Sequence, residues 1–154
     1  NVSFFGATFG DGDVSFDYAT FGEGDVSFEG ATFGVGAVSF IDAIFDAGSI
    51  SFRGTIFGKG VITFADAILG KGSLIFDDAS FKENSIVFRN ADINGHLRLQ
   101  NCRNTKTLRI LSFRAMRLTG TFILEGNFTC VPDLRSTVMA AHVDLETSFI
   151  DPPR

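Results

Sequence analysis

The sequence is poor in the residues that build disulfide scaffolds, metal centres and most catalytic sites. Its 154 residues include two cysteines, two histidines, three prolines and no tryptophan. Two cysteines are too few for a disulfide framework, and neither Cys102 nor Cys130 has a second Cys or a His at metal-ligand spacing. We therefore expect both thiols to be reduced and buried. His96 and His142 also stand alone, which favours structural roles over metal binding or catalysis.

A second group of absences concerns membranes and phosphate binding. No apolar run approaches the length of about 20 residues that a membrane-spanning helix needs, and no charged-then-apolar leader is present. We expect a soluble, cytoplasmic chain with no membrane segment in this fragment. The start at Asn1 and the abrupt end at residues 151–154 favour a processed chain or an excised domain. Glycine pairs such as Gly22 and Gly24 are not followed by the Gly-Lys-Ser/Thr of a phosphate-binding loop.

Phenylalanine and glycine are abundant instead, with nineteen and seventeen copies. Phenylalanine recurs every twelve residues over eight uninterrupted repeats, which end near residue 96. A second apolar column follows five residues after the first, and a smaller apolar residue lies two positions before each column. The members of the first column are Phe4, Phe16, Phe28, Phe40, Phe52, Phe64, Phe76 and Phe88, and those of the second are Phe9, Phe21, Phe33, Phe45, Phe57, Leu69, Phe81 and Ile93.

Each repeat predicts two very short strands separated by glycine-rich corners. Apolar residues at i and i+2 with a polar residue between them indicate a strand, because successive side chains point to opposite faces. Glycines recur between the strands, and we expect them to supply left-handed or otherwise strained backbone. These corner glycines are Gly12, Gly24, Gly36, Gly48, Gly60 and Gly72.

The repeat of twelve leaves open whether one coil holds twelve or twenty-four residues. Stacked coils lie about 4.8 Å apart, so residues one coil apart become neighbours, and like charges there are destabilising. Twelve-residue coils would place Asp13 beside Asp25, together with four similar like-charge pairs. Coils of twenty-four separate most of these pairs and align Glu29, Arg53 and Asp77 in an alternating ladder. The charges therefore predict twenty-four residues per coil.

The runs Val26-Ser27-Phe28 and Ala31-Thr32-Phe33 resemble the pentapeptide-repeat family, in which a small or branched residue stands two positions before a central Phe. Members of that family fold as right-handed quadrilateral β-helices. The resemblance covers residues 1 to about 96, although two faces per coil carry two extra residues at the corners. We therefore predict an all-β fold, a right-handed parallel quadrilateral β-helix (solenoid) with about 24 residues per coil and a Phe-filled interior.

We treat residues 1–154 as one solenoid domain, regular over 1–96 and degenerate over 97–154. After residue 96 the alternation of apolar and polar residues persists weakly in three pairs of apolar residues. Cys102 falls where a repeat would place its small inward residue. Residues 133–139 fit either a short helical turn capped by Asp133 or an imperfect coil. The three alternating pairs are Leu97 with Leu99, Leu108 with Ile110, and Val143 with Leu145.

A Phe-filled solenoid leaves little room for the concave polar site that catalysis needs. We therefore predict that the chain is not an enzyme and has no cofactor and no metal. Carboxylate pairs such as Asp11 with Asp13 could be imagined as calcium ligands, but the nonapeptide calcium motif is absent and solubility of the corners explains them better.

The uneven charge is the most informative feature of the predicted surface. Residues 1–52 contain eight acidic residues and no Lys or Arg, whereas residues 93–117 contain six basic residues and no acidic residue. These two groups are the candidate interaction surfaces. Their residues are Asp11, Asp13, Asp17, Glu23, Asp25 and Glu29 in the first, and Arg98, Arg103, Lys106, Arg109, Arg114 and Arg117 in the second.

Three functions compete on this basis. A non-catalytic structural or protein-interaction module ranks first, because the strong signals all build a regular rod, and its partner would be another protein rather than nucleic acid. The family resemblance implies an alternative, a DNA mimic that binds a DNA-handling enzyme such as gyrase. Ice or surface binding is a third, suggested by one outward column of hydroxyl residues: Ser3, Ser15, Ser27, Ser39, Ser51 and Thr63.

The first nine residues begin in mid-repeat with full inward Phe content and no polar cap. This predicts an open edge at the first end of the solenoid unless another segment covers it. Truncation or end-to-end pairing into a homodimer would each explain such an edge.

Overall fold

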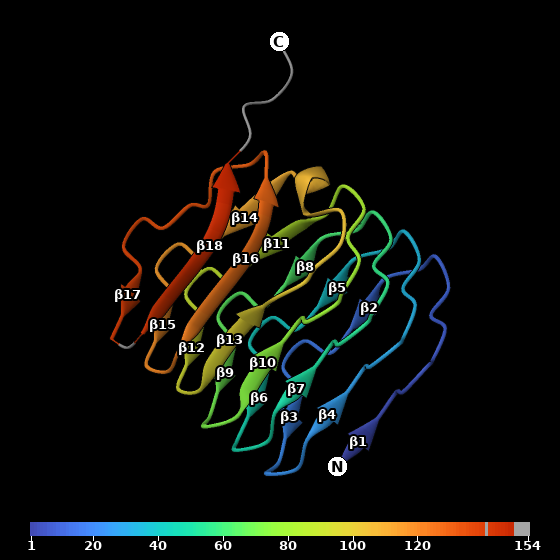
Figure 1. Cartoon of the computed structure of the whole chain (residues 1–154). Coiled ribbons are helices and arrows are strands. Elements are labelled where there is room, and N and C mark those ends of the chain that lie inside the picture. Colours follow the sequence, from blue (N-terminus) through green and yellow to red (C-terminus); the bar gives the residue numbers. More distant parts are fainter. Residues whose placement is uncertain (141, 150–154) are drawn as a thin grey trace.

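The computed structural model describes residues 1–140 and 142–149, so the expectation for the 151–154 end lies outside the described residues. The chain winds into a parallel β-solenoid of about six coils (Figure 1). Each coil has four sides, which we call walls 1 to 4 in chain order. Among the described residues no helix is long and apolar enough to cross a membrane.

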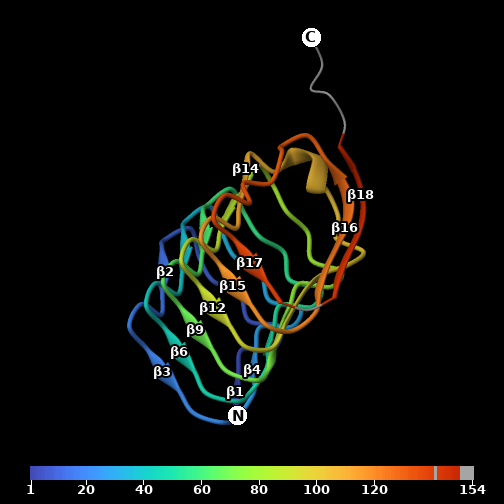
Figure 2. The same ribbon diagram turned by 90° about the vertical axis from the view of Figure 1, so that its left-hand side faces the viewer.

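Three walls are parallel β-sheets in which each coil contributes one short strand. Wall 1 contains β1 (Val2–Ser3), β4 (Val26–Ser27), β7 (Ile50–Ser51), β10 (Ser73–Ile75), β13 (His96–Leu99), β16 (Phe122–Phe128) and β18 (Val143–Phe149). Wall 3 contains β2 (Val14–Ser15), β5 (Val38–Ser39), β8 (Ile62–Thr63), β11 (Ser85–Val87) and β14 (Ile110–Ser112). Wall 4 contains β3 (Thr20–Phe21), β6 (Ile44–Phe45), β9 (Ile68–Leu69), β12 (Asp92–Ile93), β15 (Arg117–Leu118) and β17 (Val138–Met139), and faces the viewer in Figure 2.

Wall 2 is held by single bridges rather than by full strands. Parallel bridges join Thr8, Thr32, Ile56, Ser80 and Arg103 in successive coils. With this fourth wall the predicted quadrilateral cross-section is confirmed.

The register confirms coils of twenty-four residues. Val2 pairs with Val26, Val26 with Ile50, and Ile50 with Leu74. Later coils depart from this length, since Leu74 pairs with residue 97, residue 97 with 122, and residue 122 with 143. The degenerate second part is therefore a continuation of the same solenoid with corners of changed length.

Stacked phenylalanines fill the interior as predicted. Ring centroids of successive Phe in one column lie between 4.6 and 5.6 Å apart, with planes within 12° of parallel. Neighbouring columns meet edge to face, as in the 78° contact of Phe40 with Phe52. Both geometries are the favoured ones for aromatic pairs. The Phe residues of the first coil are only partly buried, because no described coil covers their outer side.

The structure explains the occurrence of glycine at the predicted corners by a different physical cause from the one predicted from the sequence. None of the six predicted corner glycines has a positive φ; that conformation falls instead on Gly6, Gly30 and Gly54 of another corner. Four of the six, Gly36, Gly48, Gly60 and Gly72, are needed because a carbonyl of the preceding coil packs against the Cα. A Cβ on Gly60 would lie 1.8 Å from the carbonyl oxygen of Gly36, and one on Gly72 would lie 2.1 Å from that of Gly48.

Two details of the second part correct or resolve the sequence interpretation. Leu111, not Ile110, points inward: Leu111 is buried and pairs with Ile86, whereas Ile110 is 53% exposed. Residues 133–139 form an imperfect coil, since Asp133 bridges to Ser112 and the segment ends in strand β17. In the described part of the chain the one helical element is the 3-10 turn η1 (Thr105–Thr107).

Candidate interaction surfaces

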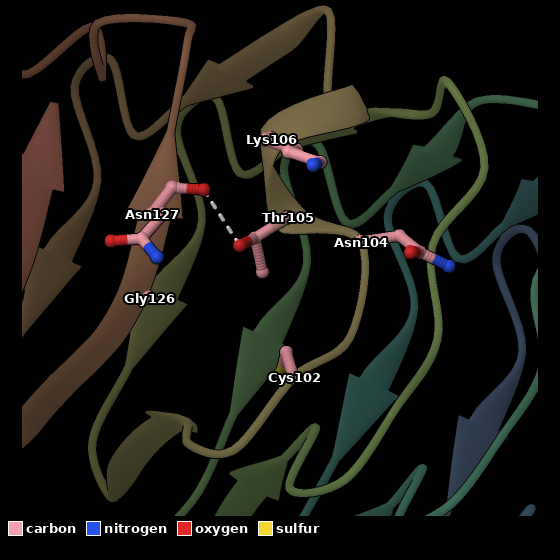
Figure 3. Close-up of a pocket in the computed structure, with 6 residues that line it drawn as sticks. All are labelled: Cys102, Asn104, Thr105, Lys106, Gly126 and Asn127. Atoms are coloured by element: carbon pink, nitrogen blue, oxygen red, sulfur yellow. Dashed lines mark hydrogen bonds between the residues drawn. The ribbon is translucent and has the colours of Figure 1, made fainter. Parts of the chain in front are cut away.

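The described residues fill the interior mainly with apolar side chains, and the polar depressions lie on the outside. The depression drawn in Figure 3 has a volume of about 270 Å³ and is lined by polar groups around η1, including Lys106 and Asn127. Its Thr105 hydroxyl is already used, because it donates to the carbonyl oxygen of Asn127 at 2.7 Å. A second depression of about 360 Å³ lies on wall 1 between Asp25 and Arg53. Among the residues that the structure describes, no group of three His, Cys, Asp or Glu side chains could hold a metal ion.

Both cysteines are free thiols, as predicted, and both are partly buried. The Cys102 sulfur lies 3.0 Å from the carbonyl oxygen of Phe76, at the small inward position that the repeat predicts. Thr55 occupies the same position two coils earlier and donates to the Phe28 carbonyl in the same way. Burial raises the pKa of Cys102 to about 12, with a further contribution from the charge of Asp77. Such a thiol is a packing residue rather than a nucleophile.

His96 has a structural contact at its corner. Its Nδ1 accepts a hydrogen bond from the backbone N–H of Thr121, one coil later, at 2.8 Å. The bond links adjacent coils at a position that earlier coils fill with Ser73, Ser49 and Asp25, not with the Gly that the repeat of twelve predicts. This contact supports the structural role predicted for His96.

The six acidic candidates do not share one wall. They occupy all four corners of the first two coils and form what we call the acidic collar: Asp11, Asp13, Asp17, Glu23, Asp25 and Glu29. Their distribution follows from the fold, because each corner takes one or two of them as the chain goes round. A partner would therefore meet this charge from any side of the solenoid end.

Four carboxylates of the collar also bond to the next coil. Asp13 accepts from the backbone N–H of Ala37, and Asp25 accepts from that of Ser49, both at 2.8 Å. Glu29 accepts from the Ser51 hydroxyl at 2.7 Å. The bonds to Asp13 and Asp25 satisfy corner N–H groups that have no strand partner. The collar is thus partly structural, a role that the sequence analysis did not identify.

Asp17 shows this structural role most clearly. Its carboxylate accepts from the N–H of Ile41 at 2.8 Å and from the Ser39 hydroxyl. Partial burial is the largest single influence and raises the pKa of Asp17, but bonds from Ser39, Ile41 and Ser15 together outweigh it and lower the pKa below its usual value. The ionised form is therefore favoured in the folded chain.

We expect Asp17→Asn to make stability less dependent on pH in acid. A carboxyl whose pKa is lowered by folding stabilises the fold above the unfolded pKa of about 3.9 and loses this contribution as pH falls through the folded pKa. The difference in unfolding free energy between wild type and Asp17→Asn should therefore shrink between about pH 6 and pH 3. Urea unfolding at both pH values measures it. Asp11→Asn, whose carboxylate makes no hydrogen bond to the described residues, is the control and should track wild type.

The six basic candidates likewise form a belt rather than a patch. They surround the fifth coil, with Arg98 on wall 1, Arg103 on wall 2, Arg117 on wall 4 and the other three at the corners on either side of wall 3. Two of the six are already in ion pairs: Arg98 with Asp77 at 2.5 Å, and Arg109 with Glu83 at 2.7 Å. The remaining four belt residues, Arg103, Lys106, Arg114 and Arg117, make no ion pair with the described residues.

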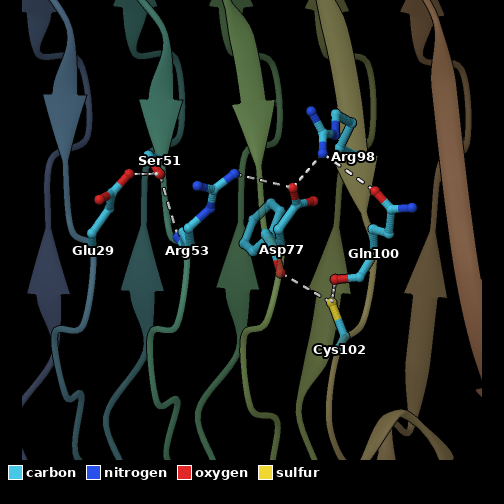
Figure 4. Close-up of polar contacts among 8 residues, drawn as sticks. Glu29, Ser51, Arg53, Asp77, Arg98, Gln100 and Cys102 are labelled. Carbon is cyan, nitrogen blue, oxygen red and sulfur yellow. Dashed lines mark hydrogen bonds and ion pairs between the residues drawn. The ribbon is translucent and has the colours of Figure 1, made fainter.

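The charge ladder predicted at the corner between walls 1 and 2 is present in part (Figure 4). Asp77 lies between Arg53, at 3.6 Å, and Arg98. Glu29 bonds to Ser51 rather than forming an ion pair with Arg53. The Asp77 side chain is 7% exposed and one of its oxygens has no hydrogen-bond partner in the described structure. The ladder therefore stabilises the stacking of adjacent coils, and its charges are not available to a partner.

The single hydroxyl column expected for ice binding is split by the fold. Ser3, Ser27 and Ser51 stack on wall 1, whereas the other three stack on wall 3. Each column is therefore only three coils long. This correction follows directly from the coil length, because residues twelve apart lie on different walls.

The geometry defines a class of protein: a four-sided parallel β-solenoid with an aromatic core and its polar groups on the outside. No model of a known protein family matches the sequence, and the comparison with curated proteins finds no match. Among solved structures, HetL, a pentapeptide repeat protein involved in heterocyst differentiation regulation from the cyanobacterium Nostoc sp. Strain PCC 7120, aligns with a TM-score of 0.17 and 11% identity, over 94% of this chain and 87% of that chain. At this TM-score the alignment carries no weight, so the class rests on the coil geometry alone.

Proposed function

We propose that this chain is a non-catalytic protein-interaction module of the pentapeptide-repeat type. The single observation that carries the proposal is the interior, which stacked Phe rings fill over most of its length, so that the outer walls provide the most extensive surface for recognition. Rigid solenoids of this kind offer extended surfaces on which side chains are held at fixed spacing.

The acidic collar is the part of the surface best suited to a partner. The first two coils carry eight acidic residues and no Lys or Arg. A protein with a basic surface would be attracted to this end and oriented by it. The two carboxylates that make no hydrogen bond to the described residues, Asp11 and Glu23, are the ones most available for such a contact.

A pull-down from lysate of the source organism tests the proposal with the fold left intact. We expect wild type to retain a protein partner and the charge-reversed variant Asp11→Lys/Glu23→Lys to lose it, because neither side chain bonds to another coil. Asp144→Lys/Glu146→Lys makes the same change of charge on β18, at the other end of the solenoid, and should retain the partner. Thermal unfolding confirms that all three remain folded.

The identity of the partner separates the two protein-binding hypotheses. Capture of gyrase, with inhibition of supercoiling by wild type but not by Asp11→Lys/Glu23→Lys, would support DNA mimicry. Another partner lost in the same variant would support a recruitment scaffold. Equal capture by wild type and the collar variant would contradict the assignment of the collar.

A further inference from the structure

The corner between walls 3 and 4 reverses its charge half-way along the solenoid. Backbone hydrogen bonds of 2.8 to 3.0 Å join this corner from each coil to the next, so its residues form one continuous edge. The first three coils place acidic residues on the edge and the last three place arginines there. These residues are Asp17, Asp42 and Asp66, followed by Arg89, Arg114 and Arg135.

The central charges of this edge make few contacts within the described chain, although the charge of Arg114 helps to lower the pKa of Asp133. Arg89 and Arg114 are exposed, lie in adjacent coils and make no ion pair with the described residues. Asp42 is exposed and its carboxylate accepts no hydrogen bond from them, while Asp66 accepts one from Asn90 at 3.1 Å. Like charges stacked about 4.8 Å apart repel each other. Each half of the edge would therefore be stabilised by an opposite charge from outside.

Wall 3, beside this edge, is suited to close approach by another flat surface. Its central outward column is uncharged over five coils and consists of Ser15, Ser39, Thr63, Val87 and Ser112. Ile110 of β14 also points outward on this wall and is 53% exposed. A facing wall could approach without burying an unpaired charge.

We propose that two copies of this chain pack side by side through wall 3 in antiparallel orientation. A two-fold axis perpendicular to the solenoid axis, between the third and fourth coils, makes the edge self-complementary. Asp66 then faces Arg89 of the second copy and Asp42 faces its Arg114, and symmetry makes each contact twice. Asp17 faces Arg135, which already bonds to Asp133 within its own chain and contributes less.

Other arrangements of two copies lack this complementarity. In a parallel pair through the same wall, equal coils would meet, and Arg114 would face Lys106 and Arg109 across the interface. In an end-to-end pair joined at the first coil, the two acidic collars would approach each other. An acidic protein of another kind would compensate only the arginine half of the edge. Charge complementarity therefore favours the antiparallel pair.

Sedimentation equilibrium on the full chain tests the proposal. Wild type should form a dimer whose dissociation constant rises at least tenfold between roughly 20 mM and 500 mM salt, because the contacts are exposed ion pairs. Arg89→Glu/Arg114→Glu, whose edge is acidic in the first five coils, should be monomeric. In Asp42→Asn/Asp66→Asn the new asparagines tolerate the positive φ of these two positions, 55° and 59°. This variant should self-associate weakly. Mixing the two variants should restore a 1:1 dimer.

The control variant is Lys71→Glu/Arg103→Glu, which makes the same change of charge on exposed residues away from wall 3 and should dimerise like wild type. Circular dichroism and thermal unfolding check that every variant is folded. A wild type that is monomeric at about 1 mM in low salt would overturn the proposal. So would a dimer that persists in Arg89→Glu/Arg114→Glu, since that dimer would use another surface.

Discussion

Replacing Phe52 with alanine should lower the free energy of unfolding by about 3 to 5 kcal/mol. The ring is fully buried and stacks between Phe28, at 4.9 Å, and Phe76, at 5.0 Å. It also meets Phe40 and Phe64 edge to face, so its loss leaves a cavity that faces two columns at once. Chemical denaturation measured by circular dichroism gives the value.

Phe4→Ala is the matched comparison, since Phe4 heads the same column in the first coil and is only partly buried. It should cost clearly less than Phe52→Ala. Because each coil is stabilised by its neighbours, the central substitution should also reduce the cooperativity of unfolding, whereas the terminal one should leave it unchanged. Equal effects of the two substitutions would contradict the inward stacking of the column.

Replacing Gly60 with alanine should destabilise the solenoid by about 3 kcal/mol, although the change adds a single methyl group. The new Cβ would lie 1.8 Å from the carbonyl oxygen of Gly36 and 2.4 Å from its carbonyl carbon. The obstacle is backbone, which cannot turn aside as a flexible side chain can. Adjacent coils would have to separate at this corner, with loss of the wall 3 hydrogen bonds beside it.

Gly12→Ala provides the control for this substitution. Gly12 belongs to the same corner column as Gly36 and Gly60, but a Cβ there meets no atom within 4 Å. Its φ lies outside the left-handed region, so alanine is not strained. We expect the midpoint of thermal unfolding to be unchanged or slightly raised. A similar loss of stability in both variants would show that chain flexibility, rather than packing of the coils, explains these glycines.

The surface charges have two roles that the predictions above separate. Asp13, Asp25 and Asp77 bond to neighbouring coils and hold the stack together. Asp11, Glu23, Asp42, Arg89 and Arg114 make no hydrogen bond or ion pair between side chains in the described structure, and they are the groups available to a partner. Experiments that neutralise all charges of one sign would mix stability with recognition. The variants that test recognition leave Asp13, Asp25 and Asp77 unchanged.

Much of the fold could be predicted from the sequence because its strongest signal is periodic. The spacing of Phe28, Phe40 and Phe52 predicts inward columns, since a continuous core along a solenoid needs large apolar side chains at equivalent positions. The alternation around each Phe predicts the short strands. The alternating charges of Glu29, Arg53 and Asp77 predict the coil length, because coils of twelve residues would stack like charges.

The tertiary structure alone decided which residues become neighbours around and between the coils. Gly60 is required by a carbonyl oxygen one coil away, and no local pattern distinguishes that need from a positive φ. The acidic and basic candidates are clustered in the sequence but are spread around the solenoid, because each coil turns four corners within twenty-four residues. The edge from Asp42 and Asp66 to Arg89 and Arg114 arises for the opposite reason: residues far apart in sequence are stacked by the wall hydrogen bonds. Sequence periodicity determines what points inward, whereas the turning of the chain determines which surface groups meet.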